Sequence, residues 1–172
     1  MNGAIGIDLV NAMSREDFLL RFGDVAEHTP WVAALAELER PFDSRDDLVD
    51  AFVGAIRIAP DAEKLDLIRA HPDLAGKAAI AGTIADASKR EQAGAGLAHL
   101  SESEYQRFTT LNTLYRRRFG FPFIFAVKGA TKDQILAEFE RRVKNDPAVE
   151  LEMALAQIGR IFRFRLEDLV RP

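Results

Sequence analysis

Signals for the start of an α-helix recur along the whole chain, and this feature limits the possible folds more than any other. A serine, threonine or aspartate before an apolar segment caps a helix by accepting a hydrogen bond from its first turn. Ser101 and Glu104 form the clearest capping box, and Pro30 and Pro147 suit the start of a helix. These signals precede eight segments, residues 15–27, 30–40, 45–59, 62–71, 88–100, 102–119, 132–145 and 147–170. In the same order, the residues that open them are Ser14, Thr29, Ser44, Asp61, Ser88, Ser101, Thr131 and Asp146.

Apolar residues within these segments recur at helical spacing. Leu48, Phe52 and Ile56 fall on one face of the third segment, together with Ala51. The apolar stripe expected on the last helix comprises Leu151, Met153, Leu155, Ile158, Ile161, Phe162 and Leu166. Each helix is therefore expected to bury one face against its neighbours.

Residues 119–130, "FGFPFIFAVKGA", depart from this pattern. The segment is apolar and aromatic, and Gly120, Pro122 and Gly129 interrupt any helix. A lone strand would find no partner in a helical chain, so an extended and partly buried loop is expected, whose amides need other partners. The sequence thus predicts an all-α fold, a single-domain bundle of about eight helices over residues 1–172 with one extended apolar loop at 119–130.

The composition is that of a globular protein of ordinary domain size. The chain has 172 residues, 48% of them hydrophobic and 29% charged. A net charge of −4 predicts no binding to nucleic acid or to an anionic membrane. We find no uninterrupted apolar stretch of ~18 residues that could span a bilayer and no basic leader, so a cytoplasmic protein is expected.

Several motifs of known chemistry are missing from the sequence. The chain has no cysteine, which excludes a thiol nucleophile and cysteine zinc sites. It lacks an HExxH motif, and His28, His71 and His99 are far apart. It also lacks a phosphate-binding glycine loop and a GxSxG elbow. Neither a metal nor an organic cofactor is predicted.

His71 stands in the stretch "AHPDLAGKAA", residues 70–79. A helix must end there, because Pro72 disfavours helical backbone in the residue before it. The side chain of His71 is therefore placed near a loop, where it could carry chemistry. The alternative is an ordinary histidine at a helix C-terminus, where the helix dipole favours its positive charge.

Glu91 and Gln92 follow Ser88 in the stretch "SKREQAGAGL". Glu91 could be a carboxylate used in chemistry. The alternative is helix capping, with Ser88 as the N-cap and Glu91 as its capping-box partner.

Arg165 lies four residues after Ile161 and three after Phe162, so its side chain could point partly inward. An inward arginine needs an anionic or polar partner. The alternative is a stem packed on the surface with its head in water. The basic stretch "YRRRF" at 115–119 is interpreted as a solvated helix end.

Six stretches of the sequence are informative together. In chain order they are "FGDVAEHTPWVA", "AHPDLAGKAA", "SKREQAGAGL", "LNTLYRRRFGFPFIFAVKG", "FERRVKND" and "RFRLEDL". This set resembles the 2-oxo-4-hydroxy-4-carboxy-5-ureidoimidazoline (OHCU) decarboxylase family of urate breakdown. The resemblance covers roughly residues 9–169. One departure is Phe125, where a small aliphatic residue is commoner in the family, and this change could alter the packing of the loop.

The resemblance implies an all-α homodimer without metal or cofactor that converts OHCU to (S)-allantoin and carbon dioxide. The family's catalytic histidine and glutamate match His71 and Glu91, and its substrate-binding arginine, counted with the catalytic set, matches Arg165. Its other substrate contacts match Pro72, Ser88, Gln92, Phe123, Ile124, Phe125, Ala126 and Val127, the last five through their backbone. This match favours a chemical role for His71.

Two alternative functions remain open at the level of sequence. One is a non-catalytic helical module whose pocket binds a ureide or a partner protein. The substrate also decays spontaneously, so a mere binder would leave the rate of its ultraviolet decay unchanged. The other alternative is a ureide hydrolase, although the chain offers no metal set or nucleophile for hydrolysis.

Overall fold

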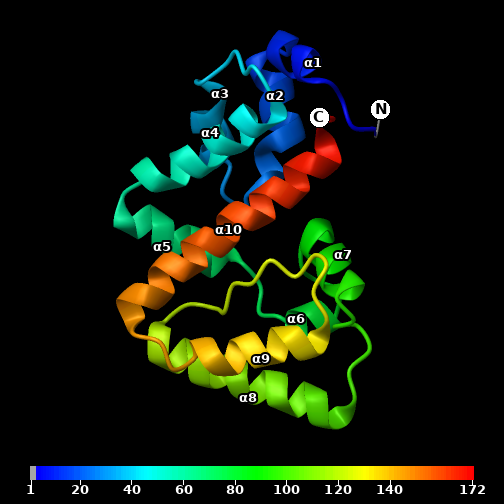
Figure 1. Ribbon diagram of the computed structural model, residues 1–172, viewed down its shortest axis with the longest axis vertical. Coiled ribbons are helices and arrows are strands. Elements are labelled where there is room, and N and C mark those ends of the chain that lie inside the picture. The colour runs from blue at the N-terminus through cyan, green and yellow to red at the C-terminus, as the bar shows by residue number, and fades with distance from the viewer. Residues whose placement is uncertain (1–2) are drawn as a thin grey trace. The chain divides into compact units, whose positions relative to one another are not determined.

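The computed structural model describes residues 3–172, apart from the side chain of Ala78, and this part of the chain is helical (Figure 1). It contains α1 (Ile7–Ala12), α2 (Arg15–Phe22), the 3-10 turn η1 (Gly23–Val25), α3 (Trp31–Glu37), α4 (Arg45–Ile58), α5 (Asp61–Ala70), α6 (Lys77–Ile80), α7 (Asp86–Gly94), α8 (Glu102–Phe119), α9 (Lys132–Arg142) and α10 (Pro147–Leu169). Within residues 3–172 the only β pairing is an isolated bridge between Ile5 and Val170. The all-α prediction is confirmed.

Four of the predicted helix starts are confirmed in atomic detail. The side chains of Ser14, Ser44, Ser101 and Thr131 each accept a hydrogen bond from the backbone amide three residues later. At Ser101 and Thr131 the box is complete, because the side chain of the third helical residue returns a bond to the cap. These caps satisfy amides that a helix cannot pair internally.

Three predicted starts are wrong in position. α5 begins at Asp61, one residue before the predicted segment. α7 begins at Asp86, after Ala85 as N-cap, so Ser88 lies inside the first turn and does not cap the helix. α3 begins at Trp31 after Pro30, and the hydroxyl of Thr29 donates instead to the carbonyl of Glu27 at 2.7 Å. The short helices α1 and α6 were not predicted, because neither begins with a side-chain cap.

The chain forms two compact units. The terminal unit comprises the residues up to Ala70 together with Gly159–Pro172, and the central unit comprises His71–Ile158. In the terminal unit, α3 packs along α4, and a core of phenylalanines forms around Phe18, Phe22 and Phe52. The ring of Phe52 meets that of Phe162 edge to face, with centroids 6.0 Å apart.

The central unit is built on α8 and α9, which lie side by side (Figure 1). Its core is an aromatic cluster of Phe108, Tyr115, Phe123 and Phe139, all buried. The rings of Phe123 and Phe139 stack with centroids 3.9 Å apart. This stack anchors the apolar loop that follows α8 to the face of α9.

The buried stripe of α10 differs from the predicted one. Leu151, Met153 and Leu155 are only half-buried. The buried side chains are Glu150, Ala154, Gln157, Ile158, Ile161, Phe162, Arg165 and Leu166. Their spacing of three and four residues is the helical period, so the helix does bury one face. Ile158, Ile161, Phe162 and Leu166 are buried as predicted. The other three predicted positions are not, because the prediction rested on apolar residue types, whereas three of the buried residues are polar.

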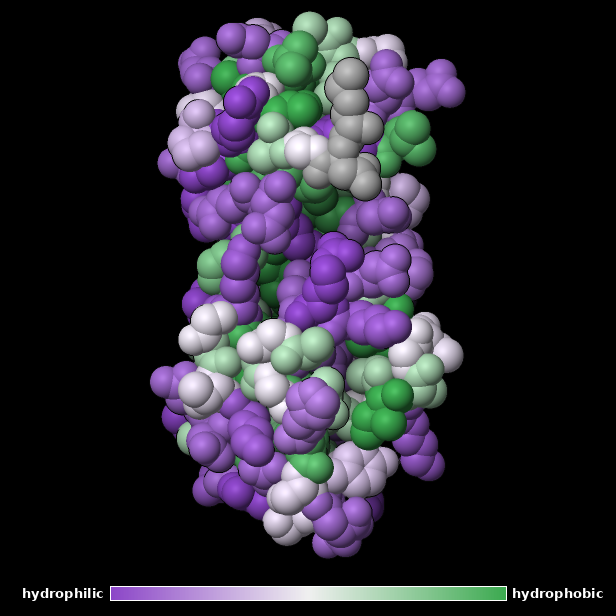
Figure 2. Space-filling model, turned by 90° about the vertical axis from the view of Figure 1, so that its right-hand side faces the viewer, coloured by the Kyte–Doolittle hydropathy of each residue, from purple (hydrophilic) through white to green (hydrophobic). Residues whose placement is uncertain are grey.

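The surface is mainly polar. Figure 2 shows one face, where hydrophilic side chains cover most of the area and hydrophobic ones form small separate groups. Large apolar residues that are exposed include Leu20, Leu38 and Ile58, and the last two line the same pocket between α3 and α4. None of the helices within residues 3–172 is both long and apolar enough to cross a bilayer.

Candidate active site

His71 lies immediately after the last residue of α5, as the proline that follows it predicts. Its side chain is 5% exposed, so water hydrates little of the imidazole ring. The following residues, 72–76, form a tight loop that leads into α6. The position at the helix end is confirmed, and the burial places the imidazole in the low-dielectric interior.

The backbone of the loop after His71 is restricted at two positions, Ala75 and Gly76. Ala75 has φ = 52°, a left-handed conformation that residues with a side chain rarely adopt. At Gly76, an added Cβ atom would stand 2.8 Å from the Cβ atom of Asp73, so this position requires glycine. The loop therefore needs support from the structure around it to keep this shape.

Gln92 on α7 supplies part of this support. Its side-chain oxygen accepts from the amide of Ala75 at 2.9 Å, and its side-chain nitrogen donates to the carbonyl of Asp73 at 3.3 Å. Gln92 is 5% exposed and also lines a pocket of about 400 Å³ next to α6 and α7. The sequence predicted Gln92 as a substrate contact, and the structure shows that both ends of its amide bind the loop.

The α8 helix supports the same loop from another side. The Nδ2 atom of Asn112 donates to the carbonyl of Leu74 at 2.9 Å, and the Nε atom of Arg116 donates to the carboxylate of Asp73 at 2.8 Å. Neither residue was predicted from the sequence. The basic stretch at 115–119, which includes Arg116, was interpreted as solvated. Its partner Asp73 lies 43 residues away, and such a distant contact leaves no local signal in the sequence.

Ser88, Glu91 and Gln92 lie three and four residues apart and therefore share one face of α7. Ser88 is 4% exposed, whereas Glu91 is half-buried. Because the helix begins at Asp86, Glu91 lies in its second turn and is too far along the helix to cap it. The capping interpretation of Glu91 is therefore wrong, and its carboxylate is placed on the same face as the side chain that binds the loop after His71.

The apolar loop at 119–130 follows Gly120, whose φ of 75° ends α8. Between residues 121 and 127 every side chain but that of Phe125 is buried, and the segment pairs with no strand in the described chain. Its polar backbone groups bind side chains instead. Arg142 donates to the carbonyl of Ile124 at 2.7 Å, and the amide of Ala126 donates to Gln157 at 2.9 Å. The predicted extended, buried loop is confirmed.

Arg142 belongs to a fully buried polar network. Its Nε atom donates to the carboxylate of Glu150 at 2.7 Å, and both side chains are 0% exposed. The same carboxylate accepts from the hydroxyl of Tyr115 and, at 3.0 Å, from the side chain of Asn145. Burial raises the pKa of Tyr115, and the hydrogen bond to Glu150 raises it further, so the hydroxyl stays a donor. The guanidinium also lies 4.5 Å from the ring of Phe123.

This network determines which way the loop amides point. In an extended chain, the carbonyl of one residue and the amide two residues later point to the same side, and the residues between them point to the other. The carbonyl of Ile124 and the amide of Ala126 both face the helices that carry Arg142 and Gln157. The amides of Phe125 and Val127 are therefore expected on the opposite side, where they can serve a ligand.

Arg165 lies in the terminal unit and is 7% exposed. Its side chain therefore points inward, and the alternative of a surface stem with its head in water is wrong. Its two terminal nitrogens donate to the carbonyl of Val25 and to the carboxylate of Glu27, each at 3.0 Å. Glu27 is the anionic partner that a buried arginine requires, and it is 3% exposed. These bonds fix the plane of the guanidinium.

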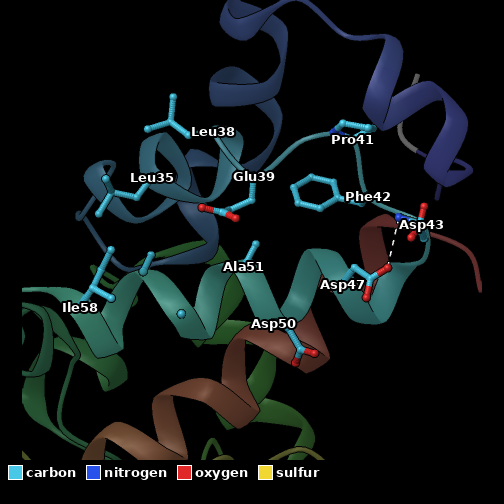
Figure 3. A pocket seen from close by; sticks show the side chains of 12 residues that line it. Leu35, Leu38, Glu39, Pro41, Phe42, Asp43, Asp47, Asp50, Ala51 and Ile58 are labelled. Atoms are coloured by element: carbon cyan, nitrogen blue, oxygen red, sulfur yellow. Dashed lines mark hydrogen bonds between the residues drawn. The ribbon is translucent and has the colours of Figure 1, made fainter.

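Most of the predicted residues lie in the same compact unit. His71, Pro72, Ser88, Glu91, Gln92 and residues 123–127 all belong to the central unit. A separate pocket of about 580 Å³ lies between α3 and α4, with Leu35, Phe42 and Ile58 among its apolar lining and acidic side chains such as Asp43 and Asp50 around it (Figure 3). None of the predicted site residues lines that pocket. Within the described residues no group of three or more histidines and carboxylates is placed to hold a metal ion.

Comparison with known proteins identifies the family. The OHCU decarboxylase family model matches residues 11–167. A 2-oxo-4-hydroxy-4-carboxy-5-ureidoimidazoline decarboxylase of Haloferax volcanii is 43% identical over 159 residues, which are 92% of each chain. The uric acid degradation bifunctional protein PucL of Bacillus subtilis is 40% identical over 164 residues, 95% of this chain and 32% of that protein.

A solved structure agrees with these sequences. The crystal structure of an (S)-allantoin synthase superimposes with a TM-score of 0.78 at 27% identity, over 96% of this chain and 54% of that chain. The fold, the matched motifs and the length of the match lead to one assignment. The chain belongs to the OHCU decarboxylase family.

Proposed function

We propose that the protein is a carboxy-lyase that converts OHCU to (S)-allantoin and carbon dioxide in the breakdown of urate. The observation that carries this proposal is the 43% identity, over 92% of both chains, to a relative named for this decarboxylase. The bifunctional relative is named for uric acid degradation, which supports the same pathway. A single family match over residues 11–167 supports one functional domain.

The substrate carries its own electron sink. When the bond between the ring carbon and the carboxylate breaks, carbon dioxide leaves and the electron pair is delocalised over the adjacent imine and, through its nitrogen, onto the oxygen of the ring carbonyl. The ring nitrogen then takes up one proton, and a second proton moves from the hydroxyl oxygen to the ring carbon that bears the ureido group. This last step creates the carbonyl and the stereocentre of allantoin. No metal or cofactor is required by this chemistry.

His71 is the residue that we assign to the proton transfer. An imidazole titrates near neutral pH, so it can take a proton from the hydroxyl and return it to one face of the ring. Delivery to one face gives a single enantiomer. Glu91 would fix the tautomer of His71 and favour its protonated form.

The remaining residues are assigned to binding. Arg165 would hold substrate oxygens with its planar fork. Pro72, Ser88 and Gln92 would contact the substrate, and the amides on the exposed side of the 123–127 loop would donate to the oxyanion that develops as the carboxylate leaves. The bonds of Ile124 and Ala126 to Arg142 and Gln157 support this orientation of the loop.

The protein is expected to accelerate (S)-allantoin formation without any added metal or cofactor. OHCU is generated freshly from urate, and circular dichroism at allantoin wavelengths is followed with and without the protein, before and after treatment with a chelator. We expect the same enzymatic rate in both cases. A rate no faster than spontaneous decay would indicate a binding module, and activity that a chelator removes and zinc restores would contradict the mechanism.

We also propose that the protein is a homodimer in the cytoplasm, which binds neither nucleic acid nor membranes. The dimer follows from the resemblance of the sequence to the family, and the net charge of −4 supports the lack of nucleic-acid binding. Light scattering at micromolar concentration is expected to give about twice the mass of one chain. A measured mass equal to that of one chain would contradict the proposed dimer.

A further inference from the structure

One face of α8 carries two polar side chains that hold the segment directly after His71. Asn112 donates to the carbonyl of Leu74 at 2.9 Å, and Arg116 donates to the carboxylate of Asp73 at 2.8 Å. The two residues are four positions apart and therefore lie one turn from each other on the same face. We propose that Asn112 and Arg116 are positioning residues for His71. This inference rests on the proposed role of His71 in proton transfer.

The loop after His71 holds a backbone conformation that its own residues do not favour. The left-handed backbone of Ala75 is disfavoured for a residue with a Cβ atom. Such a conformation persists when the surroundings impose it. Three side chains bind the backbone or side chains of residues 73–75, namely Gln92 from α7 and Asn112 and Arg116 from α8. The position of His71 next to this loop is thereby tied to α8.

The chemistry of the Asn112 side chain points to the same role. Its side chain is 7% exposed, and within the described residues its Oδ1 atom is buried without a hydrogen-bond partner. A buried acceptor without a donor is unfavourable. A leucine of similar size would remove this acceptor but would leave the buried carbonyl of Leu74 without its donor, so the fold gains little stability from asparagine in place of leucine. Asparagine supplies the hydrogen bond from Nδ2 that fixes the carbonyl of Leu74.

Arg116 differs from Asn112 in being partly exposed, with 45% of its side chain accessible. An exposed ion pair contributes little to folding. Its contact with Asp73 therefore constrains the loop without being needed for the fold. This difference provides a variant that can be tested even if changes at Asn112 disturb folding.

The experiment compares Asn112→Leu, Arg116→Ala and Arg116→Lys with the wild type, using freshly made OHCU. The neighbouring arginine on the exposed face, Arg117→Ala, is the matched control, and His71→Ala is the reference for lost proton transfer. The measurements are kcat, KM, the melting temperature and the enantiomeric excess of allantoin, corrected for spontaneous decay.

Asn112→Leu is expected to lower kcat about tenfold to a hundredfold, because a small displacement of a catalytic group is enough for such a loss. We expect KM and the melting temperature to change little, and the enantiomeric excess to fall as proton delivery loses its direction. Arg116→Ala should show a smaller loss of kcat that Arg116→Lys partly restores. Arg117→Ala should behave as the wild type.

The possible failures are distinguishable. If His71→Ala is inactive while Asn112→Leu and Arg116→Ala both keep the wild-type kcat, the positioning role is wrong and the proposed function stands. If either variant raises KM alone, or melts early with unchanged kcat per folded molecule, that residue serves binding or folding instead. If His71→Ala keeps the wild-type kcat, the role of His71 and its positioning by α8 both fail.

Discussion

Alanine at position 71 is expected to reduce turnover about a hundredfold or more, the usual contribution of a general acid or base. The loss should fall on kcat, because the proton transfer occurs after the substrate has bound. The imidazole ring is 5% exposed, so its removal also leaves a cavity and should lower the melting temperature, and turnover is therefore expressed per folded molecule. Turnover and melting temperature are measured together on the same preparations.

Glu91→Gln is the companion variant that tests the group assigned to orient His71. The substitution keeps the size of the side chain, and α7 begins at Asp86, so no helix cap is lost. Its melting temperature should therefore match the wild type while its turnover falls.

If His71→Ala retained wild-type turnover, His71 would be a structural residue and the mechanism would have to be abandoned.

The helical fold could be predicted from the sequence because its signals are local. The caps at Ser101 and Thr131 depend on residues three positions away, and both are present as predicted. The start of α7 was misjudged for the same reason. Ala85 offers no side-chain cap, so the local pattern pointed to Ser88, whereas the helix begins before it.

The site could be predicted only in part. The matched motifs gave His71, Glu91 and the 123–127 loop, but the residues that hold them depend on partners far along the chain. Arg116 meets Asp73 across 43 residues, and Gln157 meets Ala126 across 31. No periodicity or capping rule encodes such pairs. Buried polar residues on α10 were missed for a related reason, because a polar residue type normally indicates an exposed position.

The buried network beneath the apolar loop gives the largest expected effect on stability. Arg142→Met leaves the carboxylate of Glu150 buried without its cation, and breaking a buried pair in this way costs roughly 3–5 kcal/mol. Both side chains are 0% exposed, so water cannot replace the lost partner. Unfolding in urea should show this loss of free energy. The exposed pair of Arg141 with Glu138 is the control, and Arg141→Met should change stability by about 1 kcal/mol or less.

A variant without the buried charges of Arg142 and Glu150 tests the support of the loop separately from the stability of the fold. In Arg142→Met with Glu150→Leu no buried charge remains unpaired, and Tyr115→Phe removes the hydroxyl that would otherwise lose its acceptor. Apolar replacement of a buried pair is often neutral or stabilising, so this triple variant should recover most of the lost free energy.

Turnover should not recover in the triple variant, because the carbonyl of Ile124 still lacks the donor that Arg142 supplied. A loop free to rotate its peptide groups cannot keep its amides aimed at a developing oxyanion. Stable protein with low kcat would therefore show that the buried arginine orients the loop as well as stabilising the fold. Full recovery of kcat together with stability would show that packing of Phe123 on Phe139 is enough to hold the loop, and that Arg142 has no part in catalysis.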